Sequence, residues 1–394
     1  MFSCVSGATG GALHGRQDQV GIASPRCARG SRRQTGGPRR RRLAFLLLVG
    51  AVGGIFPGPE HASGDAVAAA APSGPDGDCH RVESGRFVFH SDPWINLHHF
   101  LYQWAREVSP RPSGDRRRAV EVSERAQAGD LDGEERQKWE RAVGFYRERL
   151  IASDLLFDRD LIALRGQLAA VSCSANGLEG IDAEIRAVLL EAMTVYRQRW
   201  WPEHHTANRA WMGTQQQELK SHEAVFAERL AQAYGGEWPP ERIRVDVAAY
   251  SNWAGGYTTN HPDHVTISST GYERLEGLEM LFHEVSHAGF FEQRILGQLA
   301  VAFRRRGADR PDRLSHAIQF ATPAEILRSL LSAEERYGFV SVAERVARRS
   351  RWSDQYAIVL EYWKPFLDGQ VERAQALDRI AEELAPRHDA EKKP

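Results

Sequence analysis

Apolar residues recur at helical spacing directly after Asp92-Pro93, a pair that supplies an N-cap and a first-turn proline. A spacing of three or four places them on one face of a helix. They are Trp94, Leu97, Leu101, Trp104 and Val108. The same spacing predicts further helices over about 134–165, 181–200 and 206–233, with a break at Trp201-Pro202 and an end at Gly235-Gly236. Residues 85–235 are therefore expected to be all-helical.

The pattern changes after Pro239-Pro240, where apolar and polar residues alternate over 243–247, as in a half-buried strand. Two short β-like runs, 257–259 and 264–267, are separated by the turn residues 260–263, which predicts a hairpin. The pattern predicts an α+β fold, predominantly helical, with a small sheet in the middle third of the chain.

Helical spacing returns from Thr270 to Gly289, and again from about 313 to the end of the chain. Thr270 and Glu273 stand in the relation of a capping box, so the first of these helices is expected to begin there. The expected domains are a helical domain over 85–236, a domain over 237–340 that contains the strands and the helix after them, and C-terminal helices over 341–394.

Charge divides the chain into two unlike parts. The 394 residues carry a net charge of −1, but residues 1–68 hold nine of the 51 basic and three of the 52 acidic residues, which leaves −7 for the rest. A mildly acidic protein is a poor partner for nucleic acid or anionic lipid. The hydrophobic share of 42% excludes a disordered polymer and a protein with several membrane spans.

The N-terminal part has the features of an export signal. Four arginines, 39–42, precede the apolar run 43–56, and Ala66-Val67-Ala68 offers a cleavage site. We expect residues 1–68 to be a signal peptide with its n-region, residues 69–84 to be a linker, and the mature protein to be secreted or periplasmic without a membrane span. The alternative is an uncleaved anchor. In an oxidising compartment Cys79 and Cys173 would form a disulfide, or else remain two thiols.

Residues 283–287 carry the strongest chemical signal, His283-Glu284-Val285-Ser286-His287, an HExxH motif. Histidines four residues apart on a helix share one face, so both imidazoles can bind one Zn²⁺ ion. Glu284 would then act as general base toward a water molecule. The alternative is a histidine pair on an ordinary helix.

A small sheet followed by an HExxH helix resembles the zincin metallopeptidases, over roughly residues 242–335. The resemblance implies that the domain over 237–340 is a zincin-like metal-binding domain. The resemblance implies that the outer strand of the sheet binds an extended peptide. The matching segment is 252–257, whose alternative is a glycine-rich loop. The helical region 85–235 is expected to wall the cleft.

A catalytic zinc ion normally takes three protein ligands. The usual gluzincin spacings fall on Arg306 and Gly307, and Glu292 is expected to point away from both histidines. Glu325 is the best remaining candidate, since gluzincins complete their site with a glutamate from a second helix. Alternatively, Thr322 and Glu325 form a capping box with a first-turn proline.

Two further residues are candidates for the site. His316 is the second choice as third ligand, or, if Glu325 binds the metal, a donor to the developing oxyanion. Tyr337 follows Glu325 where several gluzincins place a tyrosine that stabilises the transition state; the alternative is a packing residue.

The sequence therefore predicts a secreted, gluzincin-like zinc metallohydrolase that cleaves peptide bonds in a peptide or protein substrate. One alternative is a zincin-fold protein that binds metal or peptide without turnover. The other is a secreted helical scaffold in which the HExxH sequence is incidental.

Overall fold

The computed structural model describes residues 79–109, 120–171, 178–260, 262–311, 313–349 and 352–385. The predicted signal segment 1–68 lies outside them, as does most of the predicted linker. Cys79 is disulfide-bonded, and its expected partner Cys173 lies outside the described residues. No helix in these ranges is both long enough and apolar enough to span a bilayer.

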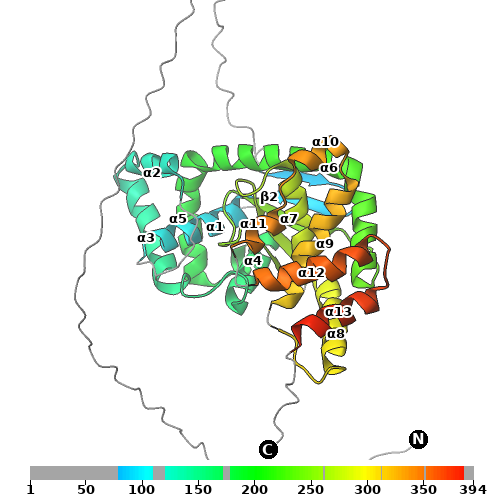
Figure 1. Cartoon of the computed structure of the whole chain (residues 1–394). Helices are drawn as coiled ribbons and strands as arrows, with labels where there is room; N and C mark the ends of the chain where they lie inside the picture. The colour runs from blue at the N-terminus through cyan, green and yellow to red at the C-terminus, as the bar shows by residue number, and fades with distance from the viewer. Residues whose placement is uncertain are drawn as a thin grey trace, which may run out of the picture. The chain divides into compact units, whose positions relative to one another are not determined.

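Helices make up most of the described chain, and a small sheet lies among them (Figure 1). The strands are β1 His80–Glu83, β2 Phe87–Ser91, β3 Ile243–Ala248, β4 Gly256–Thr259 and β5 His264–Ser268. The first helices are α1 Pro93–Glu107, α2 Val122–Gly129, α3 Gly133–Arg149, α4 Arg159–Val171, the 3-10 helix η2 Leu178–Gly180, α5 Ala183–Arg199 and α6 Trp201–Tyr234. The later helices are α7 Arg274–Ser286, α8 Gly289–Arg304, α9 Leu314–Leu330, α10 Ala333–Gly338, α11 Val342–Ala347, α12 Ser353–Leu367 and α13 Arg373–Leu384. A predominantly helical α+β fold is confirmed.

The sheet is mixed and has the order β1-β2-β3-β5-β4 among the described strands. β2, β3 and β5 are parallel to one another, and β1 and β4 pair antiparallel at the two edges. The predicted strand at 243–247 and the predicted hairpin are confirmed as β3 and as β4 with β5. β4 stands last in this order, so it is an edge strand among the described strands.

The prediction that residues 85–235 are all-helical is wrong at its beginning, where Phe87–Ser91 forms β2. Its side chains alternate between buried and half-buried, and its register pairs Phe89 with Val245 of β3. The partner strand lies about 150 residues later in the sequence. A five-residue run with such a distant partner carries little local signal of its own.

Two predicted helix starts are also wrong. The predicted break at Trp201-Pro202 is confirmed, since α5 ends at Arg199, but the next helix begins at Trp201 and not at about 206, because a proline in the first turn needs no hydrogen-bonded N–H. The helix that carries the HExxH motif begins at Arg274, with Glu273 as its N-cap residue. The Thr270 hydroxyl donates to the Ala249 carbonyl at 2.8 Å, and Glu273 stands at the N-cap position in its place.

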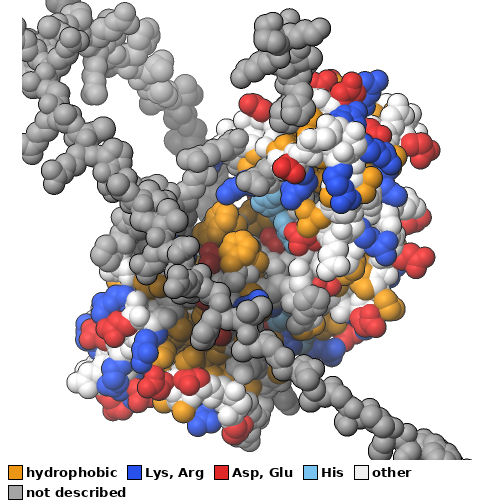
Figure 2. All heavy atoms as spheres, turned by 90° about the horizontal axis from the view of Figure 1, so that it is seen from below, with side chains coloured by type: hydrophobic (Ala, Val, Ile, Leu, Met, Phe, Trp, Pro, Cys, Tyr) orange, Lys and Arg blue, Asp and Glu red, His pale blue; other side chains and the backbone are white. Residues whose placement is uncertain are grey.

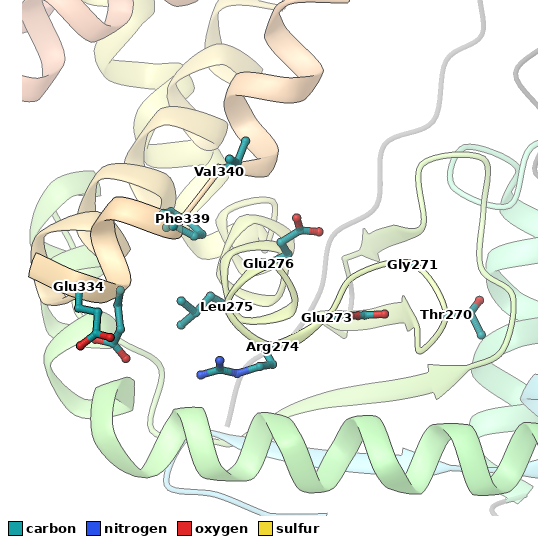
Figure 3. Close-up of a pocket in the computed structure, with 11 residues that line it drawn as sticks. Thr270, Gly271, Glu273, Arg274, Leu275, Glu276, Glu334, Phe339 and Val340 are labelled. Carbon is teal, nitrogen blue, oxygen red and sulfur yellow. The ribbon is translucent and has the colours of Figure 1, made fainter. Parts of the chain in front are cut away.

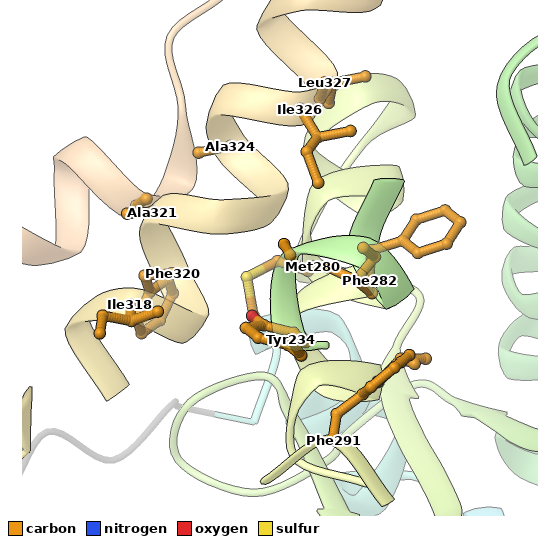
Figure 4. Close-up of a cluster of buried hydrophobic side chains, with 14 of the residues drawn as sticks. Tyr234, Met280, Phe282, Phe291, Ile318, Phe320, Ala321, Ala324, Ile326 and Leu327 are labelled. Atoms are coloured by element: carbon orange, nitrogen blue, oxygen red, sulfur yellow. The ribbon is translucent and has the colours of Figure 1, made fainter. Parts of the chain in front are cut away.

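The described residues belong to one unit, Ala68–Pro394, with two buried hydrophobic clusters. One cluster lies among α1, α3, α4 and α5, and the other lies between the sheet and the helices α6 to α9 and α11 to α13. The 34-residue helix α6 contributes Trp201 to the first and Tyr234 to the second, so it connects them (Figure 1). Figure 4 shows side chains of α6, α7, α8 and α9 meeting in the second cluster. This cluster holds the HExxH helix against the sheet.

Candidate metal centre

Three histidines converge at the C-terminal end of α7. One ligand atom from each of His283, His287 and His316 lies within 4.8 Å of the other two. His283 and His287 come from the HExxH motif, and His316 is the third residue of α9. Within the described ranges this is the group of three side chains with metal-binding geometry.

His283 is held on two sides. Its Nδ1 lies 3.1 Å from the backbone carbonyl oxygen of Gln319, and its ring stacks on Phe320 with centroids 3.7 Å apart and an interplanar angle of 19°. Burial lowers the pKa of His283 well below its usual value, and the nearby His287 and His316 lower it further. The imidazole is therefore neutral at physiological pH, as a metal ligand must be.

His287 and His316 are less buried than His283 and face the same point. Their ring centroids lie 5.2 Å apart, and each is about 5 Å from the centroid of His283. Burial lowers the pKa of His316 to about 3, with contributions from His287 and Arg313. The three rings thus present nitrogen atoms around a space small enough for a single ion.

Glu292 lies closer to His287 than the sequence predicts. Its Oε1 is 3.7 Å from His287 Nδ1. α7 ends at Ser286 and α8 begins at Gly289, so the chain turns between them and brings Glu292 back. The prediction that it points away assumed one continuous helix.

Glu284 is buried beside the histidines and faces the edge strand β4. The Thr258 hydroxyl lies 3.1 Å from Glu284 Oε2 and donates to the Glu284 backbone carbonyl at 2.7 Å. A Cβ on Gly256 would come within 2.9 Å of Glu284 Oε1. Burial raises the pKa of Glu284 to about 7, against the opposing influence of His287 and the Thr258 hydroxyl. Two residues of β4 therefore fix where this carboxylate lies.

The structure does not bring Glu325 to the histidines. Its carboxylate is buried, with an exposed fraction of 5%, and pairs with Arg328 at 2.8 Å and with Lys364 at 3.6 Å. The alternative, a helix cap, is also wrong, because Glu325 and Pro323 lie in the interior of α9. Glu325 belongs to an ion-pair cluster on the other side of that helix, and His316 stands in the position that was expected for it.

Tyr337 does not join the site either. It lies in α10 with an exposed fraction of 96%, which also contradicts the alternative of a packing residue. Tyr337 was a candidate because it follows Glu325 where several gluzincins have a tyrosine. Since Glu325 does not lie at the histidines, its spacing to Tyr337 no longer supports a role for this tyrosine.

The predicted substrate segment 252–257 only partly coincides with the edge strand. β4 spans Gly256–Thr259, and the residues before it form a turn in which Gly255 has φ of 85°, a left-handed conformation that suits glycine. Trp253 in this turn has an exposed fraction of 53%. The strand that lies beside Glu284 is therefore β4, and the turn leads into it.

One face of the molecule is hollowed, and hydrophobic and histidine side chains gather there (Figure 2). A different cavity of about 520 Å³ lies at the start of α7, between Thr270–Glu276 and the segment from Glu334 to Val340 (Figure 3). Its described lining includes none of the three histidines. Metal-binding and proton-accepting groups converge at the C-terminal end of α7, which makes that end the candidate site.

The sequence contained a signal for His316 that helical periodicity could have revealed. His316, Gln319 and Phe320 are three and four residues apart, so on one helix they share a face. All three contact or approach His283. The predicted helix start at Pro323 instead favoured Glu325 as the third ligand and left His316 as the second choice.

Comparisons with protein-family models, with curated proteins and with solved structures find no match to this chain.

Proposed function

We propose that this protein is a zinc-dependent hydrolase that cleaves peptide bonds, and that it acts after export from the cytoplasm. The observation that carries the proposal is the convergence of His283, His287 and His316 within 4.8 Å, with the carboxylate of Glu284 beside them. The N-terminal sequence supports export through its arginines, its apolar run and its Ala-rich end.

The donor set fits a zinc ion. Three imidazoles with an open fourth position form one of the common arrangements of catalytic zinc. His283 keeps Nε2 free for an ion because its Nδ1 is engaged with Gln319, and the approach of Glu292 to His287 Nδ1 favours the same arrangement there. When bound, zinc would polarise the substrate carbonyl and lower the pKa of a water molecule, so that the water can lose a proton and attack at neutral pH.

Glu284 would serve as the proton carrier. Its carboxylate lies next to the histidines without being part of the ligand set, and Thr258 holds one of its oxygens. From this place it takes a proton from the attacking water and passes it to the nitrogen of the leaving group. Gly256 leaves room for the carboxylate, because any Cβ there would overlap it.

The edge strand β4 suggests an extended peptide as substrate. Among the described strands β4 pairs with β5 alone, and an extended chain can add to the unpaired side of an edge strand. Thr258 of this strand touches Glu284, so a peptide running along β4 would pass the reacting groups. Main-chain hydrogen bonds along β4 would position the scissile bond.

A substitution of Glu284 tests the proposal. Glu284→Gln should retain the zinc content of the wild type and lose hydrolysis of a fluorescently labelled casein by a factor of about 100 or more. Undiminished cleavage by this variant would contradict the proposed mechanism. Zinc binding without hydrolysis in the wild type, across a panel of unfolded proteins, would instead indicate a binding protein.

A further inference from the structure

Pro323 stands inside α9, where a proline is normally unfavourable. In an α-helix the backbone N–H of residue 323 would donate to the carbonyl oxygen of Gln319, four residues earlier. Proline has no N–H, and its ring crowds that same carbonyl. The Gln319 carbonyl is therefore without its usual helical donor.

His283 supplies a donor in its place. Its Nδ1 lies 3.1 Å from the Gln319 carbonyl oxygen. A carbonyl oxygen only accepts hydrogen bonds, so Nδ1 must carry the proton of the neutral ring, and Nε2 is left with a free lone pair. Stacking on Phe320 holds the plane of the ring.

Gln319 makes a second connection to the same helix. Its side-chain Nε2 donates at 2.9 Å to the carbonyl oxygen of Ser286. Ser286 is the last residue of α7, where carbonyls have no partner within the helix, and it lies between the two histidines of the motif. The two hydrogen bonds of Gln319 tie α9 to α7 at the metal centre.

We propose that Pro323 is a positioning residue for this centre. Because Pro323 has no N–H, the Gln319 carbonyl accepts a hydrogen bond from His283 Nδ1 instead. This hydrogen bond selects the tautomer whose Nε2 is free to bind a metal ion. The metal-binding consequence rests on the proposed function, whereas the tautomer is a property of the metal-free protein.

Two substitutions restore the missing N–H. Pro323→Ala introduces it with a smaller side chain, and Pro323→Val introduces it with an apolar volume close to that of the proline ring. If the alanine variant fails to fold because side-chain volume is lost, the valine variant still decides the test. Pro365→Ala is the matched control, because Pro365 also lies inside a helix, α12. The carbonyl that Pro365 leaves without a helical donor belongs to Glu361, four residues earlier, and not to a residue of the metal centre.

The tautomer of His283 is measured in the metal-free proteins by long-range ¹H–¹⁵N correlation spectra of the imidazoles at neutral pH. The zinc Kd is measured by competition with a chelator. We expect the wild type and Pro365→Ala to show His283 with a protonated Nδ1. Both Pro323 variants should gain the Nε2-protonated tautomer and bind zinc about 10- to 100-fold more weakly.

An unchanged tautomer in a folded Pro323 variant would overturn the proposal. A shifted tautomer with an unchanged zinc Kd would overturn it as well, because the selection would then have no effect on the metal. If the wild type itself binds no zinc, the proposed function fails, and the spectra of the metal-free proteins still decide whether Pro323 sets the tautomer.

Discussion

Gly256→Ala should slow catalysis without releasing the metal. The added Cβ would lie 2.9 Å from Glu284 Oε1 and 3.3 Å from both Cδ and Cγ, whereas ordinary contact begins at 3.4 Å, so the carboxylate must move by about half an ångström. The atoms it meets are the end of a side chain, so the fold itself is expected to survive. A displacement of 1 Å at a reacting group can cost about 100-fold in rate, which makes a loss of roughly 10-fold reasonable here.

The assay compares kcat/KM on labelled casein with zinc content and thermal stability. A 10-fold loss corresponds to about 1.4 kcal/mol of transition-state stabilisation. Gly297→Ala is the control, because Gly297 lies in α8 and its added Cβ would meet no described atom within 4 Å apart from its chain neighbours and the backbone of its own helix; this variant should leave kcat/KM unchanged. Wild-type activity in Gly256→Ala would refute the placement of Glu284 against β4. Loss of zinc in that variant would refute the claim that Glu284 acts in catalysis without being a metal ligand.

Three further predictions concern stability. Burial raises the pKa of Glu279 from 4.5 to about 7, so between pH 4.5 and 7 only the folded state holds the proton of this carboxyl. As the pH rises through this range, the free energy of unfolding of the wild type should fall more steeply than that of Glu279→Gln, by about 1.4 kcal/mol per pH unit. Equal slopes in urea titrations of the two metal-free proteins would contradict this. Asn96→Ala should cost about 3 kcal/mol in urea unfolding, because the side chain bonds Val247 and Ala249 of the β3 segment, and a loss under about 1 kcal/mol would speak against it. Glu325→Ala should cost about 1–2 kcal/mol, since Arg328 remains partly exposed and keeps a second partner; a stability equal to that of the wild type would argue against the ion pair.

Elements with a strong local signal could be predicted from the sequence. The β4–β5 hairpin follows from two short β-like runs around turn residues, and α1 follows from Asp92 as N-cap with regularly spaced apolar residues. In α1 the Asp92 carboxylate accepts from the N–H groups of Trp94 and Ile95. These signals depend on neighbours in sequence, which is why they needed no knowledge of the tertiary structure.

The third histidine could not be assigned with the same certainty because its helix contains a proline. From the sequence, Pro323 favoured a helix start, which placed Glu325 in the first turn of a second helix and made it the preferred third ligand, with His316 as second choice. In the structure α9 continues through Pro323, and His283 Nδ1 lies 3.1 Å from the Gln319 carbonyl oxygen, which the proline leaves without its helical donor. Only tertiary contacts could reveal that compensation. Likewise β2 depends on pairing with a strand about 150 residues away.

The central claim is that His283, His287 and His316 together hold one zinc ion. Its most direct test is the zinc content of purified protein, measured by mass spectrometry of the metal after dialysis, for the wild type, His316→Ala and Glu325→Ala. We predict one zinc per chain in the wild type and in Glu325→Ala, and close to none in His316→Ala. Full zinc in His316→Ala, together with its loss in Glu325→Ala, would contradict the account and restore the glutamate as the third ligand.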